Sequence, residues 1–245
     1  ATKDYHYKDN KDSLSVTYDD KDSGFKSIFF FNDRDLYGET RNRSTYKYTE
    51  NASNYKAYNV GLDTQKVWNL RNDKDSLLAG ILVSRDKYKG TSAANNDVIA
   101  DRENYALYAQ YTYQATDKLK TVFGIREQII EDMVKDQKVF LPQFQALYKV
   151  EDNSSWYLNI GRAFQMPALS DTFKKSGSEY QQVSGKNLKP QDGWNYETGY
   201  KIINDSNSWK FSLYYMDFKN MFGWEKENGQ DIRVNKGKFK NVGFE

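Results

Sequence analysis

The residues of this chain that could bind a ligand are arginines, lysines and tyrosines, because side chains for covalent catalysis are almost absent. The 245-residue sequence has no cysteine and one histidine, His6, in a polar N-terminal stretch. The missing cysteines exclude disulfides, thiolate metal sites and cysteine nucleophiles. One histidine gives a catalytic triad or a multi-histidine metal centre almost nothing to build on. We therefore predict that the protein is not an enzyme and has no catalytic residue, no metal site and no cofactor.

Arg162 is the charged residue whose position is most informative. Its guanidinium could contact an anionic ligand through paired hydrogen bonds. It could also pair with a carboxylate on a neighbouring strand, and we favour this structural interpretation because large polar walls contain many such pairs. The acidic pairs Asp19-Asp20 and Glu131-Asp132 could bind calcium, but they lack the glycine and the spacing of a calcium loop. Solvated turn residues are the better interpretation of both pairs.

Alternation with a period of two recurs along the chain and predicts β-strands. Two sets of side chains are expected on opposite faces of the sheet. The set expected to face lipid or another apolar covering is Leu107, Ala109, Tyr111, Phe123, Ile125, Leu158, Ile160, Phe211 and Leu213. The set expected on the other face is Tyr108, Gln110, Gly124, Arg126, Asn159 and Gly161. A register error of one residue would exchange the two sets completely.

Short and long polar connections alternate strictly between the predicted strands. The short turns are Asp19–Gly24, Arg71–Asp75, Ala115–Lys118, Glu151–Ser154 and Asn204–Asn207. The longer segments lie near Thr40–Asn54, Lys87–Glu103, Glu127–Lys138, Gln165–Gly193 and Lys219–Arg233. Outer-membrane barrels have this order, with short turns on one side and long loops on the other, whereas a Greek-key sandwich has no reason to keep it.

The predicted fold is therefore all-β, an antiparallel up-and-down meander of about 11 strands that forms part or all of a transmembrane β-barrel. The last strand, near Asn235–Glu245, lacks a closing partner in the sequence. Because an open edge in lipid leaves backbone groups unpaired, we expect either a longer barrel or a sheet with covered edges. A complete barrel of ten or twelve strands is the less favoured alternative.

Composition agrees with a wall that has two different faces. Aromatic residues make up 16% of the chain although the mean hydropathy is −0.92, and a high aromatic content argues against disorder. No apolar stretch approaches the roughly 18 residues that a membrane-spanning helix needs. The net charge is +2, with charges interleaved by sign. We expect no nucleic-acid binding, because that function usually needs a concentrated basic patch.

Four segments of the second half occur in a characteristic order. They are YALYAQYTYQATDKLKTVFGIR (Tyr105–Arg126), LPQFQALYKVEDNSSWYLNIGRAFQMPALSDTF (Leu141–Phe173), GKNLKPQDGWNYETGYK (Gly185–Lys201) and SLYYMDFKNMF (Ser212–Phe222). This order resembles the barrel of TonB-dependent receptors, and the three prolines of the chain, at positions 142, 167 and 190, fall where that pattern expects them. The resemblance is specific over residues 105–245. It is looser over residues 13–104, where FFFNDRDLY (Phe29–Tyr37) and LLAGILVSRDKY (Leu77–Tyr88) look like earlier strands. We expect residues 1–245 to form one partial barrel domain, with no plug domain and no TonB box in this sequence.

The resemblance implies a receptor of the cell outer membrane that imports a ferric siderophore or a similar scarce nutrient. The implied partners are this ligand, outer-membrane lipid, and the TonB complex, reached through a plug domain. Ligand contacts are expected from the long segments, chiefly Gln165–Gly193 and Lys87–Glu103, and not from the short turns. The candidate ligand-binding residues combine fixed and mobile charge with aromatic planes, and they are Arg162, Phe164, Gln165, Tyr180 and Lys186.

Three alternatives stay open beside the siderophore receptor. Haem receptors of the family carry a histidine between two motifs that correspond here to Phe164–Pro167 and Gly185–Leu188, and no histidine lies between these segments. A soluble or surface-attached binding protein derived from a receptor would explain the polar composition and the missing strands. An outer-membrane hydrolase is the weakest alternative, because His6 precedes every predicted strand and leaves no general base at the barrel rim.

Overall fold

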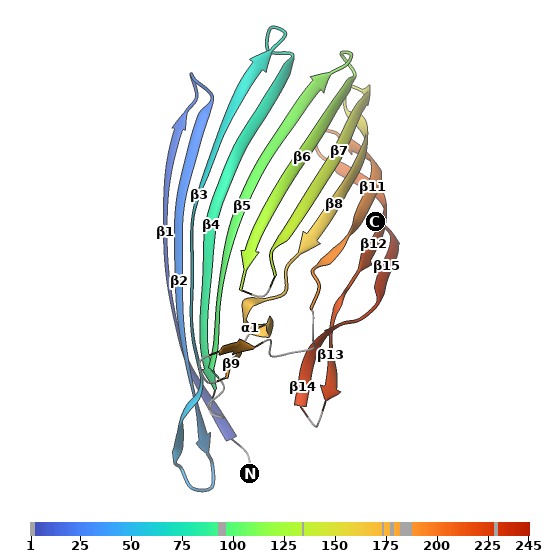
Figure 1. Cartoon of the computed structure of the whole chain (residues 1–245). Coiled ribbons are helices and arrows are strands. Elements are labelled where there is room, and N and C mark those ends of the chain that lie inside the picture. Colours follow the sequence, from blue (N-terminus) through green and yellow to red (C-terminus); the bar gives the residue numbers. More distant parts are fainter. Residues whose placement is uncertain are drawn as a thin grey trace.

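The computed structural model describes residues 3–92, 97–133, 135–172, 174–176, 179–181, 188–227 and 230–245. Eleven strands form one antiparallel meander in which each strand pairs with the strands before and after it in the sheet (Figure 1). These strands are β1 (Lys3–Asp20), β2 (Phe25–Asn42), β3 (Tyr48–Leu70), β4 (Asp75–Ser92), β5 (Asp97–Gln114), β6 (Leu119–Asp132), β7 (Gln137–Glu151), β8 (Ser154–Gln165), β11 (Gln191–Ile203), β12 (Ser208–Lys219) and β15 (Lys238–Phe244). The prediction of an all-β meander of about 11 strands is confirmed.

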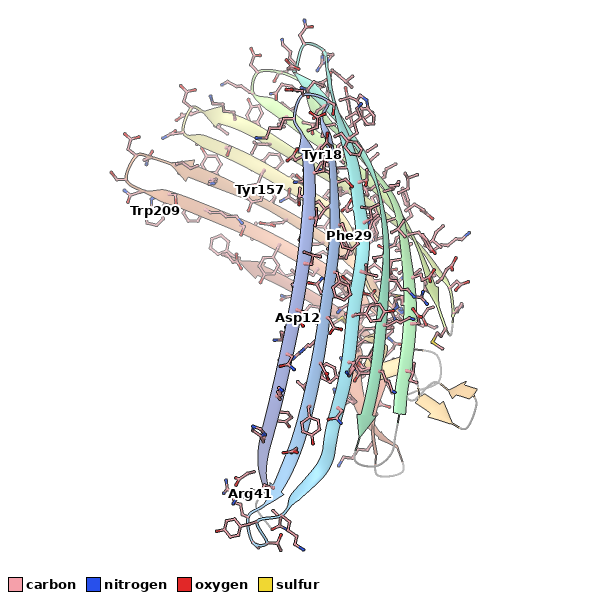
Figure 2. The ribbon with its side chains drawn as sticks, turned by 90° about the vertical axis from the view of Figure 1, so that its left-hand side faces the viewer. Asp12, Tyr18, Phe29, Arg41, Tyr157 and Trp209 are labelled. Atoms are coloured by element: carbon pink, nitrogen blue, oxygen red, sulfur yellow. The ribbon has the colours of Figure 1, made fainter. Side chains whose placement is uncertain are left out.

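The remaining elements lie in two connections between the strands of the large sheet. They are the short helix α1 (Leu169–Thr172) and the strands β9 (Lys174–Ser176), β10 (Glu179–Gln181), β13 (Phe222–Glu227) and β14 (Gln230–Asn235), which form two small hairpins. No helix in the described part of the chain is both long and apolar enough to cross a bilayer. The large sheet curves into an open wall with β1 and β15 at its two edges (Figures 1 and 2).

The strand register divides the side chains between two faces as predicted. Tyr111 lies opposite Phe123, and Phe123 lies opposite Phe144, whereas Gln110 lies opposite Gly124. We call the face of Phe123 the apolar face and the face of Gln110 the polar face. Large side chains on the apolar face are widely exposed, including Leu107 at 64% and Phe123 at 50%. An exposed apolar surface of this extent on a β-sheet is typical of a wall that contacts lipid.

On the polar face, Tyr108 of β5 reaches across β4 to β3. Its hydroxyl donates a hydrogen bond of 2.5 Å to Oδ1 of Asp63. The side chain passes over Gly80, where an added Cβ would lie only 2.4 Å from the Tyr108 ring. Glycine is therefore required at this position by close approach of a neighbour. Side chains that link strands two places apart are favoured on the inside of a curved sheet, which places the polar face on the inside.

All five predicted short turns are present, at what we call the short-turn end, but three of the long connections are shorter than predicted. Strands β2 to β7 run into the segments expected as loops, so that β4 and β5 are separated by residues 93–96 alone. β3 has 23 residues, about twice the 9–11 that cross a bilayer. The expectation that Lys87–Glu103 is a long loop is wrong, because the ladder continues there.

Cross-strand ion pairs explain why polar sequence continues as strand beyond the apolar face. Nε and Nη2 of Arg85 donate to the carboxylate of Asp101 at 2.9 and 2.6 Å, and Arg34 makes the same paired contact with Asp9 at 2.8 and 3.0 Å. The Arg34 hydrogen bonds lower the pKa of Asp9 to about 2. Opposite charges on adjacent strands stabilise pairing, so polarity alone does not distinguish a loop from a strand that extends into water.

Asp75 joins two turns at the short-turn end. Its side chain is fully buried and accepts hydrogen bonds from the Arg71 guanidinium, from the Tyr111 hydroxyl at 2.9 Å and from the Gln114 amide at 2.9 Å. The Arg71 guanidinium also donates to the carbonyl of Gln114 at 3.0 Å. Arg71 and the next two residues, Asn72 and Asp73, have positive φ angles of 50°, 53° and 64°. Because such angles are unfavourable for residues with a Cβ, the bonds to Asp75 hold this turn in place.

We predict that Asp75→Asn lowers the unfolding temperature of the purified protein by roughly 5 °C, because hydrogen bonds to a charged carboxylate are lost. The Arg71 hydrogen bonds hold the pKa of Asp75 below the usual aspartate value. The extra stability of the wild type over Asp75→Asn is therefore fully present above about pH 4. It disappears only as the pH falls through the lowered pKa of Asp75 in the folded protein. Asp117→Asn, an exposed aspartate in another short turn, is the control. Equal unfolding temperatures for Asp75→Asn and wild type at neutral pH would contradict the prediction.

Candidate functional site

The candidate site lies where strands β7 and β8 stop pairing. The two strands pair from Glu151 and Ser154 as far as Gln143 and Gly161. Beyond that point, residues 137–142 of β7 pair with β6 alone, and residues 162–165 of β8 pair with β11 alone. We call this opening the wall gap. The Arg162 side chain reaches across it, since its Nη1 donates to the carbonyl of Phe140 at 2.9 Å.

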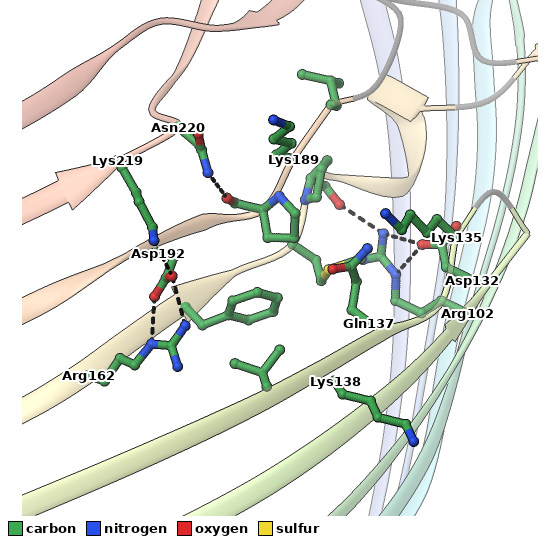
Figure 3. A pocket seen from close by; sticks show the side chains of 16 residues that line it. Arg102, Asp132, Lys135, Gln137, Lys138, Arg162, Lys189, Asp192, Lys219 and Asn220 are labelled. Atoms are coloured by element: carbon green, nitrogen blue, oxygen red, sulfur yellow. Dashed lines mark hydrogen bonds and ion pairs between the residues drawn. The ribbon is translucent and has the colours of Figure 1, made fainter.

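A pocket of about 470 Å³ occupies the wall gap (Figure 3). This volume is within the range of small-molecule sites. Residues from β5, β6, β7, β8, β11 and β12 and from the segments between them converge on it. The lining consists of Arg102, Asp132, Lys135, Gln137, Lys138, Val139, Arg162, Phe164, Met166, Pro167, Leu188, Lys189, Pro190, Asp192, Lys219 and Asn220.

One side of the pocket is held by a carboxylate that two cations share. Nε and Nη2 of Arg162 donate to the two oxygens of Asp192, both at 2.8 Å, and Nζ of Lys219 lies 3.2 Å from the same carboxylate. The Asp192 side chain is 13% exposed. The hydrogen bonds from Arg162 lower the pKa of Asp192, against the opposing effect of burial. The Arg162 guanidinium therefore has a structural partner.

The opposite side is held by a buried ion pair. Arg102 and Asp132 are 2.9 Å apart, with side chains 9% and 5% exposed. Nη2 of Arg102 also donates to the carbonyl of Pro167 at 3.1 Å. This bond attaches the segment that follows β8 to the wall formed by β5 and β6. Removing either partner of a buried pair leaves an uncompensated charge, so this pair fixes one border of the pocket.

Asn235 joins the two long connections at the rim. Its side-chain Oδ1 accepts from the amide of Lys189 at 2.7 Å, and its Nδ2 donates to the carbonyls of Lys189 at 2.8 Å and Asn220 at 2.7 Å. The side-chain Nδ2 of Asn220 in turn donates to the backbone carbonyl of Pro190 at 3.2 Å. The Asn235 side chain thus pairs with Lys189 as a neighbouring strand would, and it satisfies backbone groups that have no ladder partner there.

Lys135 and Lys189 are cations of the lining with no carboxylate partner among the described residues. The amine of Lys138, a third such lysine, points away from the centre of the pocket (Figure 3). Phe164, Met166 and other apolar side chains complete the lining. Free ammonium groups beside an apolar surface could hold an anionic group carried on an apolar body.

The five residues predicted for ligand binding are only partly brought together. Arg162 and Phe164 line the pocket, whereas Gln165 is exposed at the end of β8 and is not part of the lining. The backbone of Tyr180 lies in β10, and Lys186 lies outside the described residues. The register places Arg162 opposite Trp194, on the side of Ile160 rather than of Asn159.

Several lining residues were missed by the sequence reasoning. Arg102 and Asp132 lie 30 positions apart and on different strands, so no local pattern reveals their pairing. Asp192 lies at the start of β11, in a segment already singled out in the sequence. It is two residues from Trp194, the residue opposite Arg162, so an assumed strand register would have placed it near Arg162. No sequence pattern marks Asn235, because its contacts depend on where two connections meet in space. The described part of the chain has no cluster of three or more histidine, cysteine or acidic side chains able to hold a metal ion.

Comparison with known proteins gives a consistent result. The family model for the β-barrel of TonB-dependent receptor-like proteins matches residues 1–245. The siderophore receptor PirA of Pseudomonas aeruginosa is 16% identical, with a TM-score of 0.76 over 98% of this chain and 46% of PirA. The haemophore receptor HasR of Serratia marcescens, solved with its haemophore HasA and haem, is 14% identical, with a TM-score of 0.73 over 99% of this chain and 46% of HasR.

The solved structures therefore share the fold at low sequence identity. A ferric enterobactin receptor of Pseudomonas aeruginosa, PfeA, solved as a mutant with enterobactin, is 12% identical, with a TM-score of 0.73 over 98% of this chain and 41% of PfeA. No curated protein matches the sequence. The chain spans less than half the length of these solved receptors.

We predict that Asp192→Asn destabilises the protein by about 1–3 kcal/mol, because Arg162 and Lys219 both lose their carboxylate partner. Arg162→Gln should cost less, since Lys219 remains beside Asp192. Unfolding in guanidinium chloride measures the loss of stability in both variants. Asp205→Asn, in an exposed turn, is the control. The pKa of Asp192 is lowered, so its stabilising effect is present above about pH 4 and is lost as the pH falls through the lower, folded value. A larger loss for Arg162→Gln than for Asp192→Asn would contradict the prediction.

Proposed function

This chain belongs to the TonB-dependent receptor β-barrel family, and we propose from that premise that it forms part of the wall of a receptor that takes up a ferric siderophore or a similar nutrient. The family consists of outer-membrane transport receptors rather than enzymes. The observation that carries the proposal is the family match over the whole chain. The exposed apolar side chains on one face of the curved sheet agree with it. We propose that a curved wall of this kind serves transport rather than covalent chemistry.

The two faces suit the two surroundings of an outer-membrane wall. Exposed aromatic side chains such as Trp156 and Trp209, at 38% and 58%, accompany aliphatic ones on the apolar face. Aromatic residues are favoured at membrane interfaces, where one part of the ring system is apolar and another is wet. We propose that the apolar face contacts lipid, that the short-turn end faces the periplasm, and that the opposite end is extracellular.

Ligand capture is proposed at the extracellular end, where the wall gap lies. The proposed contacts are Arg162, Phe164, Gln165, Tyr180 and Lys186, which would combine charge and aromatic surface toward an anionic chelate. Arg162 would act there together with Asp192 and Lys219, since the structure pairs these charges. Import would be driven by the TonB complex through a plug domain, as in the family.

Haem is the less favoured ligand. His6, the one histidine of the chain, lies on β1, where Nδ1 is 3.9 Å from Glu39 and the side chain is 71% exposed. It is not among the residues that line the wall-gap pocket. The usual histidine ligand to haem iron is therefore missing from this pocket.

We predict that the full-length receptor in detergent binds a ferric siderophore more tightly than haem. Intrinsic tryptophan fluorescence would follow both titrations. Replacing Arg162 and Lys186 with glutamine should weaken an anionic chelate by about 1–3 kcal/mol for each charged hydrogen bond lost, whereas Lys201→Gln at the short-turn end is a control expected to change nothing. Tight binding of haem together with no binding of any iron chelate would contradict the ligand assignment.

Energy-dependent uptake in cells tests the transport step separately. Cells that express the receptor should accumulate iron from the chelate only while TonB is present. Accumulation at the same rate in cells without TonB would contradict the proposed mechanism of import.

A further inference from the structure

We infer that the wall-gap pocket binds a ligand group with two or more negative charges, through the side chains of Lys135 and Lys189. The shared chemistry is that of clustered carboxylate, phosphate or catecholate oxygens. The inference rests on the proposed function and deepens it, because it separates polyanionic iron chelates from uncharged ones.

The charges of the lining do not balance. Six cationic residues line the pocket, against the two carboxylates of Asp132 and Asp192. Lys138 is turned away (Figure 3), which leaves five cations against two anions around the space itself. The described lining therefore has an uncompensated charge of about +3, and clefts with an excess of one sign of charge concentrate counter-ions of the other sign.

The arginines do not provide this excess. Arg102 is neutralised by Asp132 in a buried contact, and Arg162 is held by both oxygens of Asp192. A ligand contact made by Arg162 must therefore keep its hydrogen bonds to Asp192, and it adds little positive charge beyond that of the pair. Lys135 and Lys189 are exposed, and neither amine pairs with a carboxylate of the described residues. Each amine has three donors to offer.

The backbone of Lys189 is held in place, although its side-chain amine is free. Asn235 binds both the amide and the carbonyl of Lys189, at 2.7 and 2.8 Å, and Pro190 follows directly in the chain. A cation on a fixed backbone loses less conformational freedom when it binds than a cation on an unsupported loop. Lys135 lies beside the Arg102–Asp132 pair (Figure 3), so the two free amines border the pocket on different sides.

The apolar side chains indicate what carries the charges. Phe164, Met166 and Val139 line the same space, and a bare inorganic anion would leave them in contact with water. A chelate whose charged oxygens are attached to aromatic rings or hydrocarbon would cover them. The pocket of about 470 Å³ is large enough for such a group.

The test compares three iron chelates on the full-length receptor in detergent: an anionic tris-catecholate, an anionic citrate complex and an uncharged tris-hydroxamate. Lys135→Gln with Lys189→Gln should weaken the anionic chelate that the wild type binds by about tenfold or more per lysine. Lys189→Glu should weaken it further through repulsion. The tris-hydroxamate should be unaffected by either change, and Lys201→Gln is the matched control. Circular dichroism of each variant verifies the β-sheet.

Preference of the wild type for one of the two anionic chelates supports the inference and identifies the source of the charge. An unchanged affinity in the double variant overturns it, because the lysines are then only solvated. Wild-type binding of the tris-hydroxamate alone also overturns it, while the proposed function stands. If the wild type binds no iron chelate, the proposed function fails, and this inference fails with it.

Discussion

Backbone hydrogen bonding is the constraint on which the rest of this wall depends. In lipid, an N–H or C=O group without a partner costs several kcal/mol, so each strand must be paired along the part that faces the membrane. The eleven strands meet this requirement by a simple meander in which sequence neighbours are also spatial neighbours. Where β7 and β8 separate, side chains replace the ladder. Arg162 donates to a free carbonyl of β7, and Asn235 pairs with both backbone groups of Lys189. The pocket lies where the ladder opens, and side chains of its lining and rim donate to the carbonyls of Phe140, Pro167 and Lys189.

The fold was predictable because alternation is a local signal with a period of two. Leu107 and Tyr108 were assigned to opposite faces from their neighbours in the sequence, and the register agrees. The lengths of the strands were not predictable in the same way. Arg85 and Asp101 have the composition of a loop, but they form an ion pair across two strands and the ladder continues between them. Polar residues on both faces of a strand occur wherever it leaves the membrane and enters water.

The candidate site was predictable only in part, because most of its contacts join distant parts of the chain. Arg162 and Phe164 were found since they follow a strand with clear alternation. The partner of Arg102 lies on another strand, and Asn235 contacts Lys189 from 46 positions away. Such contacts depend on how two connections meet in space, and no spacing along the sequence records that. The sequence did indicate one of the connections that border the pocket, because Pro167 and Pro190 lie near its two ends and both line the pocket.

The link from Tyr108 to Asp63 over Gly80 has a mechanical consequence. Hydrogen bonds between adjacent strands resist their separation, but they leave the sheet free to change its curvature at each strand. The Tyr108 side chain joins β5 to β3 across β4, so bending of the sheet about β4 changes the distance between the two hydrogen-bonded groups. This side chain has room only because residue 80 lacks a Cβ. We therefore expect bending of the sheet at β4 to be resisted near Tyr108 by this contact as well as by the ladder.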